Sequence, residues 1–136
     1  MNTKIAETIR SDSGFFFGDV KMIGCTATKK KAHDVANSGG GKVTDEKTGL
    51  DLAVVKVPSS HLRGLYSDNN GDQYSILTGT LALVPLELVG NQPISTMTGG
   101  RVIFGRGDAQ LEAGDNLVKI TLPSTEVVEI HTGRTE

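Results

Sequence analysis

The sequence of 136 residues has the length of a single domain, which can bury a hydrophobic core without a metal ion or a disulfide. Its formal net charge is −2, whereas a dedicated nucleic-acid-binding domain usually carries a basic excess, and its single cysteine excludes a disulfide within the chain. Val, Ile and Thr supply a quarter of the residues, and there are 17 glycines, a mixture that predicts strands joined by glycine-rich turns.

Residues 1–13 are mostly polar, with Ile5 and Ile9 on a spacing that is compatible with two turns of amphipathic helix. So short a helix is marginally stable alone, so it must pack on its own domain or on a neighbouring chain. We therefore expect an N-terminal arm over residues 1–13 and a single β domain over residues 14–136. On this hypothesis Ile5 and Ile9 are interface residues.

Three consecutive phenylalanines, Phe15, Phe16 and Phe17, follow Gly14. A strand directs Phe15 and Phe17 to one face and Phe16 to the other, so both faces should be covered. This pattern predicts a central strand of a sandwich or barrel. Alternatively, another subunit covers the side on which Phe16 lies, and Phe16 is then a third interface residue.

Residues 28–38 form the best helix candidate, because Thr28 can cap its start and Gly39 can end it. Its apolar stripe consists of Ala32, Val35 and Ala36. Three lysines at positions 29–31 oppose the helix dipole, so an exposed loop remains the alternative.

The glycines at positions 39–41 and Lys42 resemble a phosphate-binding loop only superficially. Ala36 stands where that motif needs its first glycine, and Val43 stands where it needs Ser or Thr. A flexible connection is the favoured interpretation.

Two longer apolar runs predict strands. Residues 50–57 are apolar on both alternating faces and indicate an internal strand. Residues 80–89 contain Pro85, which removes a hydrogen-bond donor and predicts an edge position or a bulge. Residues 90–100 are expected to form an exposed crossover loop, and residues 101–104 a short strand before a turn.

Residues 67–72 form a polar cluster in which Asn70 and Gly71 give a strong hairpin signal. The competing interpretation is a calcium loop, since Asp68, Asn70 and Asp72 alternate. The sixth and twelfth positions of such a loop would be Gln and Gly instead of Gly and Glu. The sequence leaves open whether the segment from Asp68 to Asp72 binds a cation.

The last hairpin allows a prediction of register. A three-residue loop at positions 123–125 pairs three couples across the strands: Ile120 with Val128, Val118 with Ile130, and Lys119 with Glu129. This register makes one face apolar except at its Glu126 end, whereas a two-residue loop would leave both faces mixed. Its weakness is Thr125, because the third loop position usually needs a left-handed residue and β-branched side chains resist that conformation.

No catalytic or metal-binding spacing is visible. The three histidines, His33, His61 and His131, are far apart, and Cys25 lies in an apolar stretch without a base nearby. An enzyme would require two of these four residues and a carboxylate to converge in a cleft. We therefore predict no enzyme activity, no cofactor and no metal.

The expected fold is mainly β, a sandwich or small barrel of about eight strands with one short helix and an N-terminal arm. The leading functional hypothesis is a structural or assembly subunit, such as a cement or decoration-type protein of a virion or other multi-subunit shell. Its expected partners are copies of itself in a symmetric homo-oligomer and a larger protein assembly, without nucleic acid or membrane. The alternative is a stand-alone binding module for a small ligand or a protein. No signal peptide is apparent, which favours cytoplasmic synthesis and possible incorporation into a virion.

Overall fold

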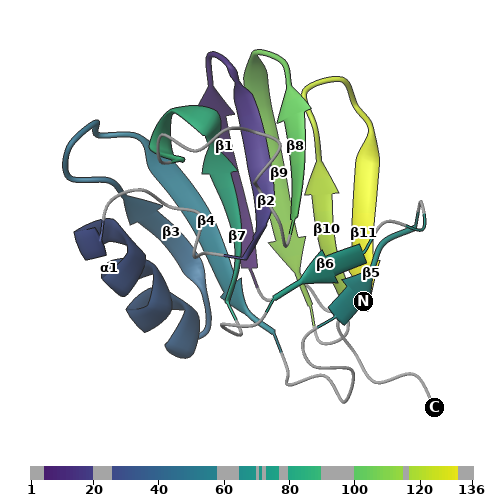
Figure 1. Ribbon diagram of the computed structural model, residues 1–136, viewed down its shortest axis with the longest axis horizontal. Coiled ribbons are helices and arrows are strands. Elements are labelled where there is room, and N and C mark those ends of the chain that lie inside the picture. The colour runs from purple at the N-terminus through teal and green to yellow at the C-terminus, as the bar shows by residue number, and fades with distance from the viewer. Residues whose placement is uncertain are drawn as a thin grey trace.

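The computed structural model describes residues 5–19, 26–57, 65–69, 71, 73–76, 80–89, 100–114 and 117–131. Two antiparallel sheets lie face to face, and one helix covers the outer face of the larger sheet (Figure 1). The four-stranded sheet has the order β1 (Ile5–Ser11), β9 (Gly107–Ala113), β10 (Leu117–Thr121), β11 (Val127–His131). The five-stranded sheet has the order β3 (Gly41–Thr44), β4 (Asp51–Lys56), β7 (Thr80–Pro85), β2 (Gly14–Asp19), β8 (Gly100–Phe104). The predicted mainly β sandwich with one short helix is confirmed.

Two hydrophobic clusters hold these layers together. The larger lies between the sheets and includes side chains from both, among them Phe15, Leu83 and Ile120. The smaller lies between the five-stranded sheet and the helix α1 (Thr26–Asn37), and it contains Ala32 and Ala36 of that helix. The larger sheet is therefore covered on both faces where α1 lies over it.

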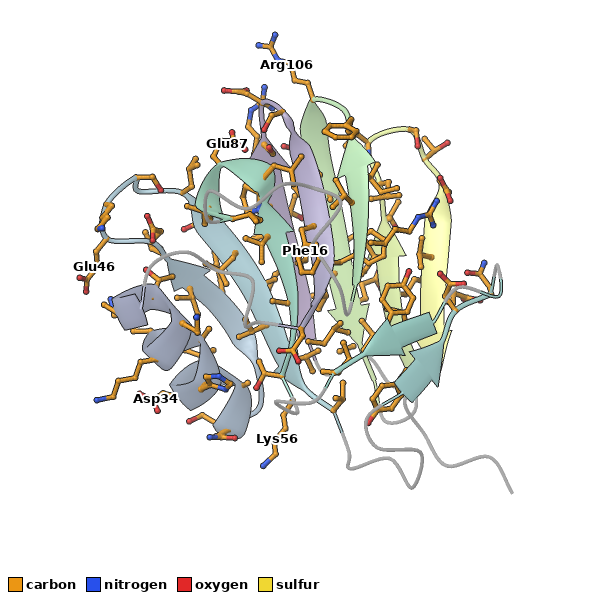
Figure 2. The ribbon with its side chains drawn as sticks, viewed as in Figure 1. Phe16, Asp34, Glu46, Lys56, Glu87 and Arg106 are labelled. Carbon is orange, nitrogen blue, oxygen red and sulfur yellow. The ribbon has the colours of Figure 1, made fainter. Side chains whose placement is uncertain are left out.

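Strand β2 confirms the alternation expected from its phenylalanines. It lies between β7 and β8, and Phe15 and Phe17 enter the core between the sheets. Phe16 lies on the opposite face and is fully buried, near the centre of Figure 2. A Cβ added at Gly100 would lie 2.6 Å from the Phe16 Cζ atom, so the ring lies against the glycine of the neighbouring strand.

The helix expected within residues 1–13 is wrong, because residues Ile5–Ser11 form β1 and pair along their whole length with β9. Ile5 and Ile9 fit a strand as well as a helix, since a spacing of four preserves the face of a strand. Ile9 lies opposite Ala109, and both are buried between the sheets.

The helix expected at residues 28–38 is confirmed, and the loop alternative is wrong. The helix begins at Thr26, so Thr28 lies in its first turn and is not its cap. The Thr28 hydroxyl instead donates a hydrogen bond of 2.6 Å to the Asp45 carboxylate.

The strand expected at residues 80–89 ends at Pro85 and continues as the short 3-10 helix η2 (Leu86–Leu88). Its predicted edge position is wrong, because β7 lies between β4 and β2. Pro85 is tolerated because it is the last residue of β7: it pairs with Phe15 of β2, while the pairing with β4 ends at Leu83. The missing amide therefore removes no hydrogen bond from the β4 side.

The register predicted for the last hairpin is confirmed at all three couples, with Lys119 opposite Glu129. Thr125 takes the left-handed conformation, with φ of 72°. Its amide donates to the Leu122 carbonyl at 2.8 Å, and the Leu122 amide donates to the Glu126 carbonyl at 2.8 Å. Burial of one face of the hairpin has thus outweighed the conformational preference of a single threonine.

The hairpin expected around Gly71 is also confirmed, with strands β5 (Leu65–Ser67) and β6 (Gln73–Ser75). Tyr66 and Tyr74 face each other on these strands, and both belong to the core between the sheets. The Tyr74 ring stacks on Phe17 with the centroids 5.8 Å apart. This small hairpin is therefore anchored to the sandwich by its aromatic side chains.

Candidate functional site

The candidate site lies at one end of the sandwich, which we call the turn end. It consists of residues 11–14, 86–88, 104–107 and 122–126. The turns between β1 and β2 and between β8 and β9 meet here with η2, at the top of Figure 1. The Gly105 amide donates to the Ser13 carbonyl at 3.2 Å, which ties the two turns together. Gly107 lies so close to Pro123 that an added Cβ would come within 2.8 Å of the ring.

Phe104 is the one large apolar side chain that is exposed among the described residues, with 66% of its surface accessible. It lies opposite Gly14, and an added Cβ at Gly14 would lie 2.9 Å from the Phe104 Cα and 3.0 Å from the Leu86 Cδ1 atom. Leu86 and Val102 are half-buried, and Val102 shares the outer face of β8 with Phe104. We call Leu86, Val102 and Phe104 together the Phe104 patch.

The Glu87 carboxylate fixes the turn beside this patch. It accepts hydrogen bonds from the hydroxyls of Ser11 at 2.6 Å and Ser13 at 2.9 Å, and from the Asp12 amide at 3.2 Å. Partial burial alone would raise the pKa of Glu87, but these hydrogen bonds outweigh it and hold the pKa below its usual value. The turn is therefore ordered before any partner binds.

Exposed charges of both signs surround the patch. The Arg106 Nε atom lies 3.8 Å from the Asp12 Oδ1 atom, and these side chains are 74% and 76% exposed. The Arg10 Nη1 atom lies 3.4 Å from Asp108 Oδ1, and these side chains are also largely exposed. Figure 2 shows Arg106 reaching out from the turn end into solvent. Each of these two pairs is neutral in itself, so opposite charges lie side by side around the patch.

A second carboxylate, that of Asp45, is buried away from the turn end. It accepts hydrogen bonds from the Thr28 hydroxyl at 2.6 Å, the Thr48 hydroxyl at 2.8 Å and the Thr48 amide at 2.9 Å. Burial would raise the pKa of Asp45, but the hydrogen bonds lower it overall. Since every donor belongs to α1 or to the turn after β3, this carboxylate fastens the helix to the sheet.

Of the four candidate catalytic residues, the structure describes the side chain of His33. The His33 Nδ1 atom lies 3.2 Å from the Thr80 hydroxyl. Cys25, His61 and the His131 side chain lie outside the described residues. No group of three His, Cys, Asp or Glu residues placed to hold a metal ion occurs in the described part of the chain.

The calcium interpretation of the β5–β6 turn can be followed only at Asp68. Its carboxylate accepts a buried hydrogen bond of 2.7 Å from the Tyr74 hydroxyl. Asn70 and Asp72, the other two candidate ligands, lie outside the described residues. The role visible for Asp68 is to hold the small hairpin together.

Two of the three predicted interface residues, Ile9 and Phe16, are buried within the single chain. Ile9 is 1% exposed and Phe16 is fully buried within the single chain, while the Ile5 side chain lies outside the described part. A second subunit would reach Ile9 or Phe16 only if the chain opened. Their participation in an interface stays a prediction, and the large apolar side chain that is exposed in the described part of the chain is Phe104.

Asn69 covers the outer edge of β11. Its side-chain oxygen accepts from the Glu129 amide at 3.0 Å, and its side-chain nitrogen donates to the Val127 carbonyl at 3.3 Å. Its own amide donates to the Glu129 carbonyl at 3.0 Å. One asparagine thus supplies three of the hydrogen bonds that a neighbouring strand would supply, which protects this edge against pairing with another chain.

Two further terminal strands carry a charged residue on their inner face. Glu7 of β1 lies opposite the buried Leu111, and Arg101 of β8 lies opposite the buried Phe17. The Arg101 Nη2 atom lies 3.4 Å from Glu126 Oε2. An inward charge at a terminal strand is a recognised protection against addition of a further strand, because that strand would bury the charge.

No sequence pattern predicted that Phe104 would be a candidate site residue. It was expected only to end a short strand. The available signal was its place directly before Gly105, Arg106 and Gly107, because a residue at the tip of a tight turn projects beyond the layer that buries its neighbours.

Comparison with known proteins finds no matching family model, no matching curated protein and no matching solved structure. Among the described residues, no helix has the length and apolar character required to span a membrane.

Proposed function

We propose that this chain is a non-enzymatic structural or assembly subunit that binds copies of itself and a larger protein assembly through the Phe104 patch. A cement or decoration-type protein of a virion or other multi-subunit shell fits this description, with synthesis in the cytoplasm before incorporation. The observation that carries the proposal is the 66% exposure of Phe104 on a turn whose neighbours are already fixed.

The physical reason is the free energy gained by removing an aromatic side chain from water. Aromatic residues contribute strongly to protein interfaces when a partner desolvates them. Because Glu87 and the Gly105 amide already order the two turns, binding would cost little further loss of conformational entropy. A rim of charges around a small apolar centre is also the usual composition of an interface between soluble proteins.

The proposal is tested by the molar mass of the wild-type chain and of Phe104→Ser, measured by light scattering over a range of concentrations. We expect the wild-type chain to form an oligomer and Phe104→Ser to remain monomeric. Lys56→Ser is the matched control, because Lys56 is exposed at the opposite end of the sandwich (Figure 2) and should leave the mass unchanged. A wild-type chain that stays monomeric at all concentrations contradicts the self-association, as does an oligomer that persists in Phe104→Ser.

A further inference from the structure

We propose that the Phe104 patch docks against the same patch of a second copy of this chain across a two-fold axis. In this arrangement Arg106 of each copy pairs with Asp12 of the other copy. The inference rests on the proposed function and names the partner surface and the geometry.

Charge complementarity at the turn end favours a second copy as the occupant. Arg106 and Asp12 lie side by side next to Phe104, one positive and one negative. A two-fold rotation places residues that lie off the axis against different residues of the same patch, so a surface with adjacent opposite charges can be complementary to itself. A strongly acidic or basic partner would instead find one member of each pair repulsive.

The pair within one chain can be exchanged at little cost. Its Nε to Oδ1 distance is 3.8 Å and both side chains are about three-quarters exposed, so the contact contributes little to folding. The Asp12 backbone is held by Glu87 whether or not the pair forms. Arg106 lies between Gly105 and Gly107, with φ of 144° and 141°, on a turn fastened by backbone contacts. Both charges therefore stay in position for a pairing between copies.

Protection of three of the four terminal strands, β11, β1 and β8, favours association at this end. A second copy could otherwise extend one of the sheets, but Asn69 occupies the edge of β11. A strand added to β1 or β8 would bury Glu7 or Arg101 on the inner face. The exposed apolar surface at Phe104 lies beyond these edges, on the outer face of β8 and the turn that follows it.

The test uses two charge reversals, Asp12→Arg and Arg106→Asp, in the full chain. Each variant alone places like charges against each other across the two-fold axis, so we expect its self-association to weaken by about tenfold or more. When the two variants are mixed, each Arg faces an Asp of the other copy, and a heterodimer should form with an affinity close to that of the wild-type dimer. Sedimentation velocity of each variant and of the mixture measures this, and circular dichroism checks that both variants fold.

The matched control reverses Lys119 and Glu129 in the same way, in separate variants and in a mixture. These residues face each other across β10 and β11 on the outer face of the four-stranded sheet. Neither variant nor their mixture should alter the association measured for the wild-type chain.

The outcomes separate this inference from the proposed function. Association restored only in the mixture of Asp12→Arg and Arg106→Asp supports the two-fold pairing. If Phe104→Ser abolishes the oligomer but the charge reversals have no effect, the two-fold pairing is wrong and the assembly role stands. A wild-type chain that stays monomeric overturns both the two-fold pairing and the self-association in the proposed function.

Discussion

Replacing Asn69 by Ala tests whether a single side chain protects the edge of β11. The substitution removes the acceptor of the Glu129 amide and the donor to the Val127 carbonyl, while the bond from the Asn69 amide to the Glu129 carbonyl can remain. Asn69 is exposed, so the substitution leaves no cavity in the core. Any loss of stability therefore reports on the edge alone.

The magnitude follows from the two hydrogen bonds. Each contributes about 0.5–1.5 kcal/mol net, and water replaces part of this at an exposed site, so Asn69→Ala should lower the free energy of unfolding by about 1–2 kcal/mol. The slope of the unfolding free energy against urea concentration should not change, because the surface area exposed on unfolding stays nearly the same. The freed amide of Glu129 should also exchange its hydrogen faster than in the wild-type chain.

Asn69→Asp is the matched variant. It keeps the oxygen that accepts from the Glu129 amide but replaces the donor to the Val127 carbonyl by a second oxygen. Hydrogen exchange should therefore remain slow at the Glu129 amide in Asn69→Asp and become fast in Asn69→Ala. Equal protection of this amide in the wild-type chain and in Asn69→Ala would refute the edge-protection argument.

Four further variants test other contacts by their unfolding free energies. Because the pKa of Glu87 is lowered in the folded chain, the stability that its charged form contributes is present above the ordinary glutamate pKa of about 4.3 and is lost as the pH falls through the folded value. The difference in unfolding free energy between wild type and Glu87→Gln should therefore shrink on acidification, and a constant difference would contradict this. Thr125→Gly should raise the unfolding free energy by about 0.5–1 kcal/mol, since the backbone strain relieved at the left-handed position exceeds the entropic cost of a more flexible unfolded chain. A lower melting temperature than that of the wild-type chain would contradict this. Gly100→Ala should lower the unfolding free energy by about 2–3 kcal/mol, because its Cβ would lie 2.4 Å from the Phe17 carbonyl oxygen. The control Gly49→Ala has open space and meets only backbone strain of about 1 kcal/mol. Equal losses of stability in the two variants would show that the close approach of β8 to β2 does not require glycine at position 100.

The sequence was informative wherever burial alone decides the structure. The last hairpin has one register that makes a face apolar, so Val118, Ile120 and their partners fixed it even though Thr125 is unsuited to its place. Strand β2 was equally clear, because three phenylalanines in succession require cover on both faces.

The sequence failed where the deciding contact is distant along the chain. Ile5 and Ile9 suit a helix or a strand equally, and only the pairing with β9 selects the strand. Strand β9 itself escaped detection because its inward side chains include the small residues Ala109 and Ala113. The exposure of Phe104 likewise depends on which residues cover it, and no local pattern states that.

The two hydrogen-bonded carboxylates differ in what they hold in place, the hydrophobic core or the proposed binding surface. Asp45 and Glu87 each accept from two hydroxyls and one backbone amide, so their local chemistry is the same. Asp45 is buried and ties α1 to the sheet, where the helix covers the smaller hydrophobic cluster. Glu87 is exposed and ties down a turn that covers no such cluster but carries Asp12 beside Phe104. A turn fastened this firmly without a core beneath it is what a preorganised contact surface requires, because the entropy of ordering it has already been lost during folding.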